Sequence, residues 1–381
     1  MKLVLAPDSF KGNMRSIEVC QILEAAFAAV LPDLEIIAIP MADGGEGTTE
    51  ALVAAMSGAL RSIRVHGPLG EMVDASYALV DGGRLAVMEM AAASGMELLA
   101  SSQLDPMRTS TYGTGEMIRD CLGQGTRDIV LGIGGSATVD GGVGMAQALG
   151  FRFLDADGRE LGQGGSVLSR IARIDANAAE PRLAECTVRV ACDVTNPLTG
   201  ADGAARVFGP QKGATPEMVE DLESGLANLQ RVWERQGMLE KGVPGDGAAG
   251  GLGAGLRAFC GARLESGARL VADVVGLRAH LKGADILVTG EGCTDGQTAA
   301  GKLCAVLADI AREEGVRSLL ISGALRGDLA ALNERFDYAL ATSVGECDLE
   351  AAIRNGRNAL RFTATNAARL LAACEELSVP T

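Results

Sequence analysis

Histidine and aromatic residues are scarce in this sequence of 381 residues. His66 and His280 are its two histidines, and phenylalanine, tryptophan and tyrosine together make up 3% of the chain. A histidine-based catalytic triad and a histidine-ligated metal cage are therefore disfavoured. Any chemistry must run on Asp, Glu, Lys and Ser side chains and on backbone amides.

Paired cysteines and long apolar runs are also missing. The nine cysteines are an odd number, and no two are spaced as CxxC, which favours reduced, buried thiols over disulfides or zinc. No apolar run approaches the roughly 20 residues of a membrane-spanning helix, and the opening MKLVLAPDSF turns polar too soon for a signal peptide. We expect a cytoplasmic protein without a membrane partner.

The charge balance excludes one class of partner. The formal net charge is −15, and a nucleic-acid backbone attracts the opposite sign. A local basic pocket on an acidic protein can still take a small anionic substrate. We expect small-molecule partners and no nucleic acid, and the sequence leaves a homodimer open.

Glycine is abundant, with 51 residues in the chain, about twice the ordinary usage of roughly 7%. The glycines occur in short bursts between apolar runs, which suits tight turns and a backbone brought close to a ligand. The two ends of the chain share a βαβα rhythm typical of a parallel sheet covered by helices. The predicted terminal strands are 2–6, 34–39, 286–289, 318–322 and 338–341, and the helices are 14–30, 48–56, 303–314 and 349–374.

The middle of the chain has a different character. Strands are predicted at 61–66, 72–80 and 84–90, the last two joined by a DGG turn at 81–83, and again at 128–132 and 187–191. We therefore predict an α/β protein in which residues 1–60 and 281–381 form one parallel-sheet domain. Residues 61–280 form an inserted mixed α/β domain.

The first candidate loop, APDSFKG at 6–12, follows the opening strand. Loops at the carboxyl ends of parallel strands are where α/β proteins bind ligands. Asp8 and Ser9 are candidates for contacting the substrate or a phosphate, and Lys11 is a candidate catalytic cation. For Asn13, capping of the next helix is the preferred interpretation.

A second loop, MADGGEGT at 41–48, places Asp43 and Glu46 on either side of two glycines. Capping of the following helix accounts for Glu46, whereas Asp43 is a candidate metal ligand or base. A third segment, 128–150, carries Gly134, Gly135, Ser136, Thr138 and Asp140 after a buried strand. These residues suit a phosphate or carboxylate cradle. Their spacing matches GxGxxG only loosely, and the acidic residue that a dinucleotide fold needs is missing, so an oxidoreductase is disfavoured.

A fourth loop reads GEGCTDGQTAAGKL at 290–303. Its GxxxxGK run is followed by Leu303 and not by a hydroxyl residue, so it is not a P-loop. Lys302 can still meet a phosphate as a point charge, and Glu291 and Asp295 are further binding candidates. In the long polar loop 191–213, Asp193 is a candidate metal ligand or base and Asn196 a binding residue. Gln211 and Lys212 are expected in the same polar loop.

Eight ordered motifs run nearly the length of the chain. They are APDSFKG, ADGGEGT, MAAASG, TYGTGE, GIGGSATVDGG, CDVTNPLTG, FGPQKGAT and TGEGCTDGQTAAGK. With them the sequence resembles the bacterial glycerate kinase family. The resemblance implies phosphorylation of D-glycerate by ATP with Mg²⁺, usually to 2-phosphoglycerate. It also implies a flavodoxin-like domain with an insert that resembles the restriction-endonuclease core. Phosphorylation at the 3-hydroxyl and a non-catalytic sugar-acid or nucleotide sensor remain the alternatives.

The resemblance supplies no catalytic residues, so these follow from chemistry. Phosphoryl transfer needs cations on the phosphate, Mg²⁺, and a carboxylate near the attacking hydroxyl. Lys11 and Lys302 are the candidate cations, while Asp43 and Asp193 compete for the metal or base role. We expect the candidate loops to face a cleft between the two domains.

Overall fold

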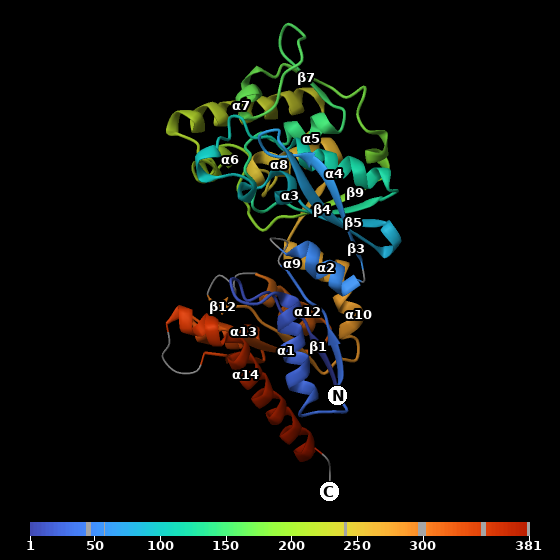
Figure 1. Cartoon of the computed structure of the whole chain (residues 1–381), viewed down its shortest axis with the longest axis vertical. Helices are drawn as coiled ribbons and strands as arrows, with labels where there is room; N and C mark the ends of the chain where they lie inside the picture. The colour runs from blue at the N-terminus through green and yellow to red at the C-terminus, as the bar shows by residue number, and fades with distance from the viewer. Residues whose placement is uncertain (43–46, 57, 240–241, 296–301, 344–347, 379–381) are drawn as a thin grey trace. The chain divides into compact units, whose positions relative to one another are not determined.

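The structure is a computed structural model that describes residues 1–42, 47–56, 58–239, 242–295, 302–343 and 348–378. The chain forms two compact units with a mixed α/β fold (Figure 1). The terminal unit comprises residues 1–43, 50–56 and 268–381, and the middle unit comprises 44–49 and 57–267. Among the described residues, no helix combines the length and apolar character that crossing a membrane requires.

The terminal unit contains a parallel sheet of five strands in the order β15-β13-β11-β1-β2. The predicted strands 2–6, 34–39 and 286–289 are neighbours in it, because β1 pairs with both β2 and β11. Their carboxyl ends therefore lie at one edge of the sheet. The strands are β1 (Lys2–Leu5), β2 (Glu35–Ala38), β11 (Ile286–Thr289), β13 (Arg317–Ser322) and β15 (Tyr338–Ala341).

Helices cover both faces of this sheet, because its strands are apolar on both sides. On β13, Leu319 and Ile321 join the core under α1 and α14, whereas Leu320 joins a second cluster with Cys304 of α12. Figure 1 shows α1 and α14 side by side. The helices are α1 (Ser16–Ala28), α2 (Thr48–Met56), α9 (Gly267–Val274), α10 (Leu277–Leu281), α12 (Leu303–Glu313), α13 (Leu329–Arg335) and α14 (Leu349–Ser378). A small parallel pair, β12 (Cys293–Thr294) and β14 (Ala324–Leu325), completes the unit.

The middle unit contains a mixed sheet of six strands in the order β10-β9-β6-β5-β4-β3. Strands β5, β6, β9 and β10 are parallel, whereas β3 and β4 form antiparallel pairs at the other edge. The predicted turn at 81–83 is a short 3₁₀ turn, η1, between β4 and β5. The strands are β3 (Ala59–His66), β4 (Met72–Val80), β5 (Leu85–Glu89), β6 (Asp128–Gly132), β9 (Thr187–Ala191) and β10 (Arg263–Glu265).

The core of the middle unit lies between this sheet and its helices. Trp233 of α7 and Phe259 of α8 meet there in an edge-to-face contact with centroids 5.8 Å apart. The helices are α3 (Ala91–Ser94), α4 (Tyr112–Gly123), α5 (Val143–Ala148), α6 (Ala204–Phe208), α7 (Pro216–Gln236) and α8 (Ala248–Cys260), with a small antiparallel pair, β7 (Arg152–Leu154) and β8 (Arg173–Asp175). Short 3₁₀ turns connect them, among them η6 (Pro210–Lys212).

Candidate functional site

A cavity of about 860 Å³ lies in the terminal unit, bordered by the loops that follow β1, β11, β13 and β15. Asp8, Ser9, Lys11, Glu291 and Lys302 line it, so these predicted residues come together. The loops pack closely, since the Asp8 N–H donates to the Gly290 carbonyl at 2.8 Å. A cavity of this size is typical of small-molecule sites.

The lining of this cavity carries charges of both signs. Lys11, Lys302 and Arg326 are exposed cations. Asp8 is buried, and its Oδ1 accepts the Ser9 N–H at 2.6 Å, while Glu291 accepts a hydrogen bond from Thr294 Oγ1 at 3.0 Å. Burial raises the pKa of the Cys304 thiol, and the charges of Glu291 and Asp8 raise that pKa further. Both carboxylates therefore lie near this thiol, inside a cation-lined cavity.

Asp295 follows β12 and does not line the cavity, and Asp43 lies outside the described residues. Conversely, Arg326 and Ser343 line the cavity and were not predicted. Each follows a predicted strand of the same sheet, so inspecting the residues after 318–322 and 338–341 would have found them.

The glycine-rich segment 134–140 follows β6 in the middle unit. Gly134 and Gly135 are exposed, whereas Ser136, Thr138 and Asp140 are buried. Asp140 accepts hydrogen bonds from the N–H and Oγ1 of Thr111, both at 2.8 Å, and from the Gly142 and Gly144 N–H groups at 3.1 and 3.2 Å. Burial raises the pKa of Asp140, and these four hydrogen bonds oppose that shift. A buried acceptor with four donors fixes the turn after the segment.

Lys212 lies beneath this segment, although the sequence placed it in a polar loop. Its side chain is 1% exposed, and its Nζ donates to Ser136 Oγ at 2.6 Å and to the Thr138 carbonyl at 2.7 Å. Burial lowers the pKa of Lys212 to about 7, opposed by the charge of Asp140. FGPQKGAT carries no local pattern that would have signalled this burial.

Other parts of the middle unit contact the same segment. The Ala137 N–H donates to the Ser94 carbonyl at 2.9 Å, and Thr109 Oγ1 donates to the Ala137 carbonyl at 2.8 Å. The Gly250 Cα lies so close that an added Cβ would sit 2.0 Å from the Thr138 carbonyl. Thr138 Oγ1 is buried and has no hydrogen-bond partner among the described residues. The segment is thus held from several sides while its two glycines stay accessible.

Asp193 and Asn196 follow β9, the parallel neighbour of β6. They therefore emerge at the same sheet edge as the segment 134–140. Asp193 is exposed and its Oδ1 accepts the Gly267 N–H at 3.0 Å, while Asn196 Nδ2 donates to the Asp202 carbonyl at 2.9 Å. Among the described residues, no cluster of three His, Cys, Asp or Glu side chains could hold a metal ion.

Histidine chemistry was disfavoured by the sequence, yet His66 is paired with a carboxylate. Its Nδ1 lies 3.0 Å from Glu116 Oε2, and its backbone N–H donates to the same oxygen at 2.7 Å. His66 ends β3 and Glu116 lies in the first turns of α4, so tertiary contact alone brings them together.

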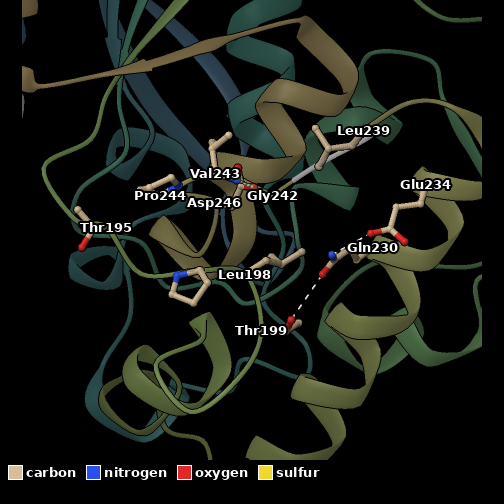
Figure 2. A pocket seen from close by; sticks show the side chains of 11 residues that line it. Thr195, Leu198, Thr199, Gln230, Glu234, Leu239, Gly242, Val243, Pro244 and Asp246 are labelled. Atoms are coloured by element: carbon tan, nitrogen blue, oxygen red, sulfur yellow. Dashed lines mark hydrogen bonds between the residues drawn. The ribbon is translucent and has the colours of Figure 1, made fainter.

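A second cavity, of about 360 Å³, lies in the middle unit beside α7 (Figure 2). Figure 2 shows Gln230 bonded to Thr199 and to Glu234, at 3.5 and 3.0 Å. Asp246 lines the cavity and accepts hydrogen bonds from Arg257 Nη1 at 2.7 and 2.8 Å. Residues next to Asp193 and Asn196 in the chain, among them Thr195 and Pro197, line this cavity.

The α/β fold with parallel sheets and a cation-lined cavity at a carboxyl edge fits a small-molecule phosphotransferase. Residues 3–372 match the glycerate kinase family, and the chain belongs to this family. It is therefore an enzyme and a kinase.

Relatives and a solved structure agree with this assignment. The chain is 45% identical to a glycerate 2-kinase of Escherichia coli K12, over 91% of this chain and 92% of that one. It is 42% identical to a glycerate kinase of Haemophilus influenzae, over 98% of this chain and 99% of that one. A crystal structure from Salmonella typhimurium LT2 that carries the name glycerate kinase 2 superposes with a TM-score of 0.90 at 44% identity, covering 99% of both chains.

Proposed function

We propose that this kinase phosphorylates D-glycerate with ATP and releases 2-phosphoglycerate and ADP. The observation that carries the proposal is the cavity of about 860 Å³ in the terminal unit, with Lys11, Lys302 and Arg326 in its lining. Three cations at one sheet edge suit the phosphates of a nucleotide. The family match and the glycerate 2-kinase relative support the substrate and the 2-position.

The same cavity fits a Mg²⁺-bound nucleotide. Mg²⁺ bound with a nucleotide typically takes one or two carboxylates together with phosphate oxygens and water. Asp8 and Glu291 offer carboxylates within this lining, and Asp43 and Asp193 remain proposed ligands or bases from the sequence. When bound, the ion would neutralise charge on the phosphates undergoing transfer. In this proposal Lys11 and Lys302 bind and orient those phosphates.

The terminal unit is proposed to be flavodoxin-like. In chain order its strands run 2-1-3-4-5 across the sheet, the order of that doubly wound fold, which binds ligands at the carboxyl edge where the order reverses. The restriction-endonuclease-like insert and a cytoplasmic location are likewise proposals. The cytoplasmic location is supported by four free, buried cysteines, Cys20, Cys121, Cys260 and Cys304.

Turnover tests the proposal directly. Purified protein with ATP, Mg²⁺ and D-glycerate is expected to release ADP, and omission of either glycerate or Mg²⁺ should stop the release. A folded protein that binds glycerate yet releases no ADP would overturn the proposal.

Alanine variants test the assigned roles. Lys11→Ala and Asp193→Ala should each lower kcat on the order of 10²-fold, because each removes an electrostatic or base group. The thermal midpoint should barely change, since both side chains are exposed. Lys282→Ala, at an exposed lysine that does not line the cavity, is the matched control. Normal turnover by both variants would show that neither Lys11 nor Asp193 takes part in catalysis.

A further inference from the structure

The ammonium of Lys212 lacks a carboxylate in contact among the described residues. Its two hydrogen-bond partners are the Ser136 hydroxyl and the Thr138 carbonyl. The charge of Asp140 acts on the pKa of Lys212, but the Asp140 carboxylate accepts its hydrogen bonds from Thr111, Gly142 and Gly144. A fully buried cation in this position is costly. A negatively charged ligand that binds at the segment 134–138 would therefore change the protonation state of Lys212.

Ser136 is the link between this buried lysine and the accessible surface of the segment. It is 5% exposed and follows the exposed Gly134 and Gly135. A serine hydroxyl has one donor hydrogen and two acceptor positions. When Lys212 is protonated, its Nζ donates to Ser136 Oγ, and the serine hydrogen is available to a ligand. When Lys212 is neutral, its lone pair accepts that hydrogen, and the hydroxyl presents only lone pairs outward.

We propose that Lys212 and Ser136 form a proton-coupled seat for an anionic oxygen at Gly134–Thr138. Binding of a carboxylate or phosphoryl oxygen at the segment takes up one proton from solvent onto Lys212 Nζ, and protonation of Lys212 in turn strengthens the binding. This coupling is reciprocal because it is a linkage between two binding equilibria. The proposal rests on the proposed function, which supplies both anions, as glycerate and as nucleotide. Lys212 is a positioning residue here and acts through Ser136.

The direction of the pH dependence follows from the burial of Lys212. Burial lowers its pKa to about 7, and Asp140 is the one charged group among the described residues whose charge raises that pKa. Above that pH the unliganded protein holds a neutral Lys212. An arriving anion favours the ammonium, so binding consumes a proton, and affinity falls by up to about tenfold per pH unit.

Isothermal titration calorimetry at pH 8 in Tris and in Hepes measures the protons taken up. Two ligands are titrated separately: D-glycerate without nucleotide, and ADP without glycerate. We expect uptake of up to one proton per site with one of them. Uptake with glycerate assigns the seat to its carboxylate, whereas uptake with ADP assigns it to phosphate.

Three variants separate proton coupling from a merely structural role. Lys212→Met should lose the uptake and bind with a pH-independent, weaker affinity. Ser136→Ala keeps the buried lysine and cuts the relay, so it should lose the uptake as well, and it stands as the test if Lys212→Met does not fold. Lys282→Met should behave as the wild-type protein does.

Two results would overturn the proposal. One is wild-type protein that turns over glycerate but binds both D-glycerate and ADP, each alone, without proton uptake between pH 7 and 9, or that binds neither of them alone. The other is Ser136→Ala protein that takes up as many protons as the wild type. Failure of the proposed function has a different signature, because it is the absence of ADP release whatever the proton count.

Discussion

A lysine ammonium loses its hydration when it is buried, and Lys212 is 1% exposed with two neutral hydrogen-bond partners. The neighbouring Asp140 faces the opposite situation, since its carboxylate is buried but fully supplied with donors. At the scale of single residues, the segment 134–140 is thus held by one acidic group that accepts four hydrogen bonds and by one basic group whose hydrogen-bond partners are both neutral. Both residues can be tested through stability.

For Lys212 the test is the pH dependence of unfolding. Its pKa is about 7 in the folded protein and about 10.4 in an unfolded chain. Between these values the unfolded state binds more protons, so stability rises with pH, by up to about 1.4 kcal/mol per pH unit. Urea unfolding of wild-type protein and Lys212→Met at pH 6.5, 7.5 and 8.5 should show their difference shifting in favour of the wild type as pH rises. Parallel curves would show that Lys212 does not titrate in this window.

For Asp140 the test is a neutral isostere. Asp140→Asn places an amide N–H₂ where the surroundings supply only donors, so at least one of the hydrogen bonds from Thr111, Gly142 or Gly144 must break. The expected loss is about 2 kcal/mol of unfolding free energy, measured by urea denaturation. Asp74→Asn, at a side chain that is 77% exposed, is the control and should be nearly neutral. Equal stability of both variants would contradict the hydrogen-bonding arrangement.

At the scale of elements, the backbone at the start of α8 lies very close to the backbone of the segment 134–140. Gly250 has φ of +68° and Gly251 has φ of +88°, and the Gly141 N–H donates to the Gly250 carbonyl at 3.1 Å. The glycines of GDGAAGGLGAGL, residues 245–256, leave room for this packing of backbone against backbone. The glycines at the start of α8 therefore pack directly against the backbone of the segment.

Gly250→Ala is expected to destabilise the protein by about 3 kcal/mol. An alanine there needs a left-handed backbone and would place its Cβ 2.0 Å from the Thr138 carbonyl, so strain and overpacking add. Gly261→Ala at the end of the same helix has φ of +62° and open space around it, and should cost only about 1 kcal/mol. Thermal unfolding of the two variants compares them. A Gly250→Ala protein no less stable than Gly261→Ala would contradict the close approach.

The elements themselves were largely predictable. The strands 72–80, 128–132, 187–191, 286–289 and 338–341 coincide with β4, β6, β9, β11 and β15, because strands leave short runs of alternating or continuous apolar residues between turns. In the terminal unit, five predicted residues line one cavity since their loops follow parallel strands. Lys212 and the His66–Glu116 pair were not predictable, because burial and pairing across distant segments leave no local pattern. The role of Asp43 as a metal ligand or base stays a prediction.

At the scale of the whole molecule, the chain divides into two compact units whose boundaries lie near residues 57 and 268. The predicted domain limits at 60 and 280, and the predicted cleft between the domains, stay predictions. Family membership rests on a match over residues 3–372, so it covers both units.

Identification of the product tests the central claim most directly. Phosphorus NMR of a reaction containing the purified protein, ATP, Mg²⁺ and D-glycerate should show one new phosphomonoester, 2-phosphoglycerate, growing as ATP is converted to ADP. A reaction without glycerate is the control and should leave the ATP signals unchanged. A 3-phosphoglycerate signal would contradict the proposed position of transfer, and an unchanged ATP spectrum in the presence of glycerate would contradict the kinase itself.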